Sequence, residues 1–153
     1  MFLGRYFHAI DEKGRVAIPH KFRTYLGGPN EGRVVITISP KENLSYLDIY
    51  PANRWEAIVE EILSTEISGE DAGEVQEALL ANYIHPAQEG TLDKQGRILI
   101  PQEHRQAAGL VKDVVYTGDI RKFRLWSVDA WERYKETAEQ NKQKIKGLKG
   151  VWI

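Results

Sequence analysis

The 153-residue chain contains no cysteine, and none of its apolar runs approaches the roughly 18 residues that a membrane-spanning helix requires. The lack of cysteine excludes disulfides and thiolate metal sites, and it agrees with a cytoplasmic protein. No secretory leader is predicted, because Arg5 and Asp11 interrupt the first residues before an apolar segment can form. We therefore expect a cytoplasmic protein with no membrane partner.

Motifs of common enzymes are absent as well. The sequence has no GxxxxGK[ST], GxGxxG or GxSxG segment. Adjacent Glu60 and Glu61 are expected on a helix surface and not in a buried acid pair. The histidines do not follow the HxxxH spacing of a metal site; they are His8, His20, His85 and His104. The sequence therefore predicts no catalysis, no metal, no cofactor and no small-molecule substrate.

Charge is nearly balanced in total but unevenly distributed. The formal net charge is −1. Residues 1–27 carry five basic and two acidic side chains, a net of +3, whereas residues 52–80 carry one arginine and eight acids, a net of −7. From Arg133 onward six basic residues accompany two acidic ones, a net of +4. A near-neutral total can therefore conceal an anion-binding face.

The strongest internal signal is a repeat. The segment DEKGRVAIP, residues 11–19, returns as DKQGRILIP, residues 93–101. Weaker similarity continues in the same order beyond both segments, which indicates that one unit was duplicated. Each unit predicts a strand, a tight turn, a second strand, one helical turn, two strands and a helix. We assign residues 1–83, with an acidic helical segment, to the first unit, and residues 84–153, with a C-terminal helix and a basic tail, to the second.

In each unit the DxxG sequence predicts a hairpin turn. Asp11 and Asp93 can accept hydrogen bonds from nearby backbone N–H groups, and Gly14 and Gly96 can adopt a positive φ. Apolar residues at successive positions after each turn predict strands that are buried on both faces. This pattern favours an interleaved sheet over a simple surface hairpin.

The helix ends can also be predicted. The prolines of the two IP pairs suit the first position of a short helix that Gly27 or Gly109 would end. Asn53 and Asp129 are predicted to cap the longer helices of the two units. The arginines of the short helices are expected to pair with nearby acids; they are Arg23 and Arg105.

The paired DxxGR segments, each followed by IP, together with the start MFLGRY and the duplicated order, resemble the MraZ family over nearly the whole chain. The resemblance implies a mixed α/β, β-rich fold. That fold would be a tandem swapped-hairpin, AbrB-like β-barrel, in which the two units form one compact intrachain pseudo-dimer with peripheral helices. The family also implies ring-shaped homo-oligomers that are associated with the nucleoid. These would bind double-stranded DNA at direct repeats upstream of their own division and cell-wall operon and regulate its transcription.

The resemblance further implies that DxxxR elements read the DNA. Arginines beside the turns can contact phosphates or pair with guanine in the major groove, whereas an internal pair with the turn aspartate is the alternative. The predicted DNA-binding residues are Arg15, Lys13, Arg97, Lys94 and Arg5. The predicted turn-organising residues are Asp11, Gly14, Asp93 and Gly96. Because the turn lysine shifts by one position between the copies, we expect the two turns to contact DNA differently and favour the first.

A second hypothesis is a protein-interaction or antitoxin-like assembly module of the same superfamily, for which DNA binding is incidental. The duplicated module and the short basic segment after it are less typical of such antitoxins. That segment, KQKIKGLKGVWI, leaves two roles open. It either contacts phosphates without specificity, or it docks the end formed by Val151, Trp152 and Ile153 on a neighbouring subunit.

Overall fold

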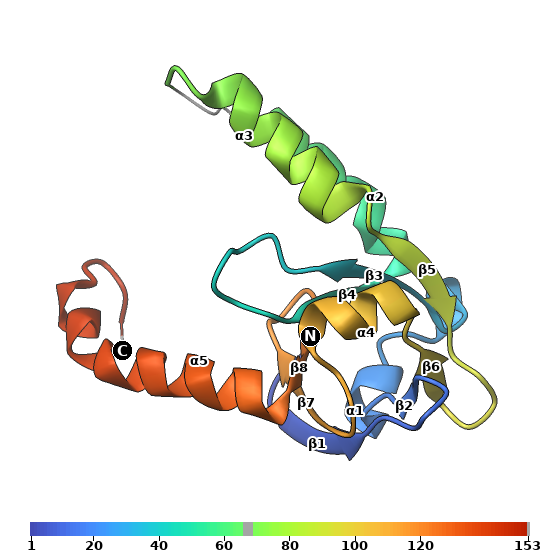
Figure 1. The fold of residues 1–153 in the computed structure, drawn as a ribbon. Coiled ribbons are helices and arrows are strands. Elements are labelled where there is room, and N and C mark those ends of the chain that lie inside the picture. Colours follow the sequence, from blue (N-terminus) through green and yellow to red (C-terminus); the bar gives the residue numbers. More distant parts are fainter. Residues whose placement is uncertain (66–68, 153) are drawn as a thin grey trace.

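The computed structural model describes residues 1–65 and 69–152 and contains two units with the same order of elements (Figure 1). The first unit consists of β1 (Arg5–Ala9), β2 (Arg15–Ala17), α1 (His20–Arg23), β3 (Arg33–Ile38), β4 (Leu47–Pro51) and α2 (Ala52–Ser64). The second consists of β5 (Gln88–Thr91), β6 (Arg97–Leu99), α4 (Gln102–Ala108), β7 (Asp113–Gly118), β8 (Phe123–Ser127) and α5 (Val128–Gln140). The predicted order of strands and helices is confirmed in both units.

Further helical elements lie outside this repeated order. Helix α3 (Ala72–Leu79) and the π-helical turn η2 (Leu80–Ile84) lie between the units, and the 3-10 helices are η1 (Gly28–Asn30) and η3 (Lys142–Gly147). Helices α2 and α3 run side by side and project from the sheet, while α5 projects in another direction (Figure 1). None of the helices in the described part of the chain is long and apolar enough to span a membrane.

The sheet interleaves the two units. Its six antiparallel strands follow the order β1-β7-β8-β4-β3-β5. The first strand of each unit thus pairs with the other unit, β1 with β7 and β5 with β3. Strands β2 and β6, one from each unit, also pair across the units and form a separate two-stranded ribbon. The predicted interleaving is confirmed.

The predicted closed barrel is wrong, because β1 and β5 form the two ends of an open sheet. The chain turns away from the sheet after each of these end strands. It then continues into β2 or β6, which are three residues long and pair only with each other. The structure has a mixed α/β fold with a six-stranded antiparallel sheet and a small two-stranded ribbon.

The prediction that β2 and β6 are buried on both faces is also wrong. The side chains of Val16 and Ile98 are both 1% exposed, which fits the inner face. On the other face Leu99 is 57% exposed, and Ala17 is half-buried. The ribbon therefore has one inner face against the core and one outer face open to solvent.

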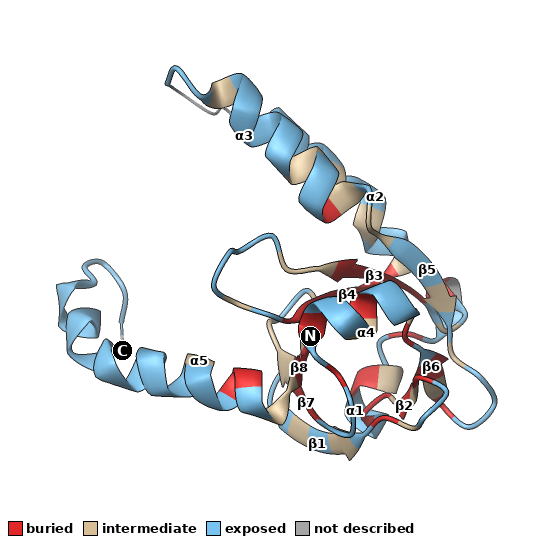
Figure 2. Cartoon of the chain, viewed as in Figure 1, coloured by how far each residue is buried: buried red, intermediate tan, exposed pale blue. Residues whose placement is uncertain are grey.

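The core lies between the sheet, the ribbon and the short helices (Figure 2). Aromatic rings fill much of it: the Phe2 and Phe22 ring centroids are 5.3 Å apart at an interplanar angle of 86°, and those of Phe22 and Phe123 are 4.8 Å apart. A second cluster packs the start of α5 on the sheet through Trp126 and Trp131. Beyond that contact α5 is exposed, as are most residues of α2 and α3 (Figure 2). These helices therefore gain little stability from burial.

The helix ends correct several predictions. Gly109 ends α4 as predicted, with a φ of 65°. Helix α1 ends at Arg23, earlier than the predicted Gly27, and hydrogen-bonded turns follow it from Thr24 to Leu26. Asn53 does not cap α2, since that helix begins directly after the end of β4, and the Asn53 N–H donates to Asn30 Oδ1 at 3.1 Å.

The cap of α5 differs in the same way. Ser127, the last residue of β8, accepts a hydrogen bond on Oγ from the Ala130 N–H at 3.1 Å. Asp129 lies inside the first turn, where its negative charge interacts favourably with the helix dipole but its side chain does not cap the helix. In both units the strand continues directly into the helix, so each predicted cap is two residues too late.

Candidate nucleic-acid interface

The first turn is organised by the carboxylate of Asp11. Its Oδ1 accepts hydrogen bonds from the backbone N–H groups of Lys13 at 3.0 Å and Arg15 at 2.9 Å. The Gly14 N–H donates to the Asp11 carbonyl at 3.0 Å, and Gly14 has a φ of 87°. The sequence DxxG thus supplies both the acceptor and the positive φ that close the turn.

The second turn repeats this geometry. Asp93 Oδ1 accepts from the N–H groups of Gln95 at 2.8 Å and Arg97 at 3.0 Å. The Gly96 N–H donates to the Asp93 carbonyl at 3.0 Å, and the φ of Gly96 is 76°. The two copies therefore form one kind of turn, although their second and third residues differ.

Each turn aspartate also holds the following arginine. Arg15 Nε lies 3.1 Å from Asp11 Oδ2, and Arg97 Nε lies 3.2 Å from Asp93 Oδ2. Within residues 1–65 and 69–152, the Nη groups of both arginines have no hydrogen-bond or ion-pair partner. The aspartates thus orient the guanidinium groups through Nε and leave their outer edges available to a ligand.

Both aspartates are stabilised in the ionised form. Hydrogen bonds from backbone N–H groups, that of Arg15 first, hold the pKa of Asp11 below its usual range. The Arg97 N–H has the same principal effect on the pKa of Asp93. Because these pKa values are lowered in the folded state, the carboxylates stabilise the fold at pH values above the usual 3.8.

A pH dependence follows from these lowered pKa values. As pH falls through the folded-state pKa values of the two aspartates, their contribution to stability is lost. We expect the Tm of the parent protein to fall more steeply below about pH 4 than the Tm of an Asp11→Asn, Asp93→Asn variant. Thermal unfolding followed by circular dichroism at several pH values measures the difference. Parallel Tm profiles for the two proteins would contradict the assigned role of these carboxylates.

The ribbon brings the two arginines to one face. Arg15 lies opposite Leu99, Arg97 lies opposite Ala17, and the buried Val16 and Ile98 form the pair between them. Because alternate residues of a strand share a face, both arginines and Leu99 lie on the outer face. Diagonal positions in such a pair are separated by roughly 7–8 Å. Leu99 was not predicted as a site residue, although its place two residues after Arg97 on the same strand was the available signal.

Each turn is supported by the opposite unit. The Ile100 N–H donates to the Gly14 carbonyl at 2.7 Å, and the Ile18 N–H donates to the Gly96 carbonyl at 2.9 Å. A side chain at position 14 would place its Cβ 2.8 Å from the Arg105 guanidinium. The isoleucines that follow β2 and β6 therefore each form a hydrogen bond to the turn of the opposite unit.

The predicted acid partners of the short-helix arginines are wrong. Arg23 Nε donates to the Ile18 carbonyl at 3.0 Å, and its guanidinium lies against Gly96. Arg105 occupies the equivalent place against Gly14. Neither arginine forms an ion pair with any residue that the structure describes. Both side chains lie against the glycine of the opposite turn, but among the described residues only Arg23 donates a hydrogen bond to the backbone, and the buried Nε of Arg105 has no such partner.

The other predicted basic residues are distributed unequally. Lys13 and Lys94 are exposed within the two turns, which lie at opposite ends of the antiparallel ribbon. Arg5 lies at the far end of β1, and its guanidinium carbon is 5.9 Å from the centroid of the Trp131 ring. At about 3.3 Å per residue, Arg5 is roughly 13 Å along the strand from Ala9, where the first turn is approached. The structure thus gathers four of the five predicted residues around the ribbon.

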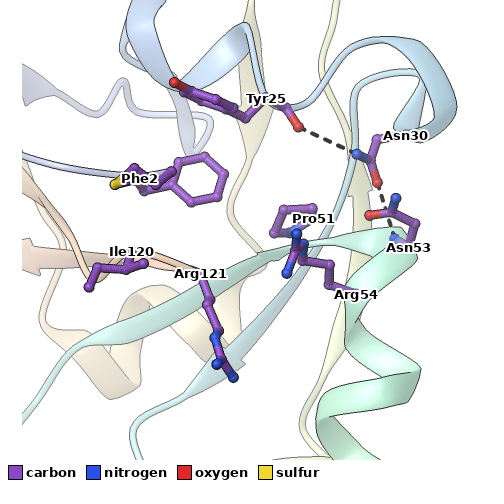
Figure 3. A pocket seen from close by; sticks show the side chains of 9 residues that line it. Phe2, Tyr25, Asn30, Pro51, Asn53, Arg54, Ile120 and Arg121 are labelled. Carbon is purple, nitrogen blue, oxygen red and sulfur yellow. Dashed lines mark hydrogen bonds between the residues drawn. The ribbon is translucent and has the colours of Figure 1, made fainter.

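The structure also contains an open cavity of about 350 Å³ between the N-terminal residues and the start of α2 (Figure 3). Arg54 and Arg121 supply the charged side chains of its lining. The remaining lining residues are Met1, Phe2, Tyr25, Asn30, Pro51, Asn53 and Ile120. This lining offers no carboxylate, imidazole or thiol for acid–base or nucleophilic chemistry. In the described part of the chain, no cluster of three or more His, Cys, Asp or Glu side chains could hold a metal ion.

Comparison with known proteins adds to this geometry. A family model described as "MraZ protein, putative antitoxin-like" matches residues 1–77 and 83–147. The chain belongs to the MraZ family. Its resemblance to that family is thereby confirmed over most of its length.

Relatives in the MraZ family align over most of the chain. The chain is 39% identical over 132 residues to "Transcriptional regulator MraZ" of Lachnoclostridium phytofermentans, covering 86% of this chain and 85% of the relative. The protein of the same name from Natranaerobius thermophilus is 34% identical over 145 residues, covering 95% and 94%. That of Roseiflexus sp. is 38% identical over 141 residues, covering 92% and 91%.

Proposed function

We propose that the protein is a sequence-specific DNA-binding transcriptional regulator that contacts DNA with the outer face of the β2–β6 ribbon. The proposal rests on Arg15 and Arg97, which share this face and are each held through Nε by a turn aspartate. It is supported by the relatives, which are named transcriptional regulators.

The ribbon suits the major groove of DNA. That groove admits a two-stranded β-ribbon, and an arginine can donate two hydrogen bonds to the O6 and N7 atoms of guanine. The exposed Leu99, which lies opposite Arg15 on the same face, suits apolar contact with a thymine methyl group. Lys13 and Lys94, at the two ends of the ribbon, would bind phosphates and set the register on the duplex. In this arrangement Arg5 contacts the DNA backbone farther from the ribbon.

One ribbon offers few contacts, so avidity supplies the remaining affinity. In our proposal a ring-shaped homo-oligomer binds tandem direct repeats upstream of the protein's own division and cell-wall operon. Once one copy is bound, the contacts of its neighbours become intramolecular. Binding should therefore rise steeply with the number of repeats and fall steeply with salt, since each neutralised phosphate releases counterions. Such a protein would act at the nucleoid.

The proposal predicts that each ribbon arginine is needed for specific binding. Arg15→Ala and Arg97→Ala should each weaken binding by about 10- to 100-fold, equivalent to roughly 1–3 kcal/mol for one arginine–guanine pair. The double variant should fail to retard repeat DNA. A gel-shift assay with DNA from upstream of the protein's own gene, at varied repeat number and salt, measures these effects.

Two matched variants sharpen this test. Arg33→Ala removes an exposed arginine from β3, where it pairs with Glu89 at 2.7 Å, and should leave DNA binding unchanged. Arg15→Lys retains the charge but cannot form the bidentate pair, so it should lower specificity more than nonspecific affinity. If the folded Arg15→Ala, Arg97→Ala protein retards repeat DNA as the parent does, the ribbon is not the DNA-reading surface.

A second candidate function is favoured by the antitoxin-like description of the matching family model. In that case the same fold would serve as a protein-interaction module. Recovery of a stoichiometric protein partner from the native cell, together with no retardation of upstream DNA by the parent protein, would favour this candidate over DNA binding.

A further inference from the structure

The segment that follows α5 carries apolar side chains with no partner on its own chain. Trp152 is 98% exposed, and three aliphatic side chains before it are each more than half exposed. These three are Ile145, Leu148 and Val151. The segment 142–152 also carries four lysines and no acid, and Ile153 lies outside the described residues. The combination is a basic segment with an unburied apolar side.

The hairpin formed by α2 and α3 has the complementary character. Residues 52–80 carry one arginine and eight acids, a net charge of −7. A groove of about 160 Å³ lies between the two helices. Its lining contains no charged side chain and consists of Ile62, Leu63, Thr65, Ala72, Gly73, Gln76 and Leu79. Leu63 in this lining is 38% exposed, and Val75 of α3, outside the lining, is 41% exposed. The hairpin thus presents an apolar groove within an acidic surface.

These two surfaces are separated on a single chain. The α2–α3 hairpin and α5 project in different directions, and the segment 142–152 lies at the far end of α5 (Figure 1). Both projections are largely exposed along their length (Figure 2). Because the segment is held at the end of a helix that points away from the hairpin, a contact between the two surfaces must join different copies of the chain.

We propose that the segment 142–152 of one copy docks on the α2–α3 hairpin of the next copy. Trp152 and the aliphatic residues before it cover the groove, while Lys146 and Lys149 lie beside Glu74 and Glu77. Opposite charges favour this pairing, and burial of the apolar side chains removes them from water. Such a contact joins two different surfaces, so its repetition closes a ring or extends a filament. The inference rests on the self-association in our proposed function and assigns its contact.

Two other sites for this segment fit the observations less well. DNA phosphates would attract its lysines but leave Trp152 and Val151 in water. The cavity beside α2 contains the guanidinium groups of Arg54 and Arg121, which would repel the lysines. The acidic hairpin satisfies both the charge and the apolar side chains.

Charge reversal of the full chain tests this contact. Lys146→Glu with Lys149→Glu should convert the assembly to monomers, and Glu74→Lys with Glu77→Lys should do the same. Combining all four substitutions should restore the parent mass. Size-exclusion chromatography with multi-angle light scattering measures the mass, and circular dichroism verifies the fold of each variant.

Matched controls separate this contact from general charge effects. Lys41→Glu with Lys112→Glu also reverses two exposed lysines and should leave the assembly intact. Trp152→Ser changes an almost fully exposed side chain, so it should weaken assembly without affecting the monomer fold. The docking would be overturned if the Lys146→Glu, Lys149→Glu variant and the Trp152→Ser variant both kept the mass of the parent assembly. A lower DNA affinity with an unchanged mass would also overturn it, because the segment would then bind phosphates.

The outcome is distinguishable from failure of the proposed DNA contact. If the variants at Lys146 and Lys149 lose assembly and the combination of all four charge reversals restores it, the docking is supported, whatever the result with DNA. Retardation of repeat DNA that is unaffected by Arg15→Ala and Arg97→Ala contradicts the DNA-reading ribbon while leaving the docking measurement unchanged. A parent protein that is monomeric at all ionic strengths would overturn the docking and the avidity, but not the contact of Arg15.

Discussion

Gly14→Ala is expected to lower the free energy of unfolding by roughly 2–5 kcal/mol, because it combines backbone strain with a steric clash. Gly14 has a φ of 87°, which L-residues rarely adopt. A Cβ there would lie 2.8 Å from the Arg105 guanidinium and 2.9 Å from the Ile100 carbonyl oxygen. The Ile100 N–H also donates to the Gly14 carbonyl, so relief of the clash would stretch a contact between the two units.

Gly109→Ala is the matched control for this substitution. Its φ of 65° carries a comparable strain, but a Cβ at this position would meet no other part of the described chain within 4 Å. The expected loss is therefore limited to about 1–2 kcal/mol of backbone strain. Urea denaturation of both variants and the parent measures the difference. Equal losses would show that the opposite unit does not restrain Gly14.

The local chemistry of the turns could be read from the sequence, but the partners of the turns could not. Asp11 and Gly14 act through residues that are close in the chain, so a short motif contains the necessary information. Arg105 contacts Gly14 only because the two units interleave. No periodicity within either segment indicates that contact, and the expectation of an acid partner for Arg105 was therefore wrong.

The errors in the fold have a related cause. Apolar residues at successive positions predicted strands correctly, yet they could not indicate whether the end strands of the sheet meet. The exposure of Leu99 likewise depends on the absence of a second layer over the ribbon, which is a tertiary property. Caps at Asn53 and Asp129 were expected from local propensity, but the strands before them continue directly into the helices. The direct connection of each strand to the following helix therefore determined where these helices begin.

The candidate site shows the same division. The sequence placed arginines after two equivalent turns, and the antiparallel register brought Arg15 and Arg97 to one face. In the proposed function, two contacts that are weak individually form a small DNA-reading surface because the ribbon is shared between units. The duplication therefore contributes to the fold and, in the proposed function, to DNA binding: each copy supplies one strand of the ribbon, and neither strand could form it alone.

Asp48→Ala is expected to cost about 3–5 kcal/mol, because it removes the acid from a buried group of charges. The Asp48 side chain is 1% exposed and accepts a hydrogen bond from Lys122 Nζ at 2.7 Å. It also accepts one from the Tyr83 hydroxyl at 2.5 Å, which joins the end of the α2–α3 hairpin to the sheet. Burial, with the nearby Asp48 charge, raises the pKa of Tyr83, so this hydroxyl stays a donor. The substitution should therefore destabilise the sheet and loosen the hairpin.

Tyr83→Phe separates these two effects. It retains the pair between Asp48 of β4 and Lys122, which directly precedes β8, but removes the hydroxyl that anchors the hairpin. We expect it to cost about 1–2 kcal/mol and to increase amide hydrogen exchange mainly in α3 and η2. Asp48→Ala should instead increase exchange in both the hairpin and the central strands. Chemical denaturation with exchange mass spectrometry compares the two variants. If Asp48→Ala costs no more than Tyr83→Phe, the contact with Lys122 does not stabilise the junction between the two units.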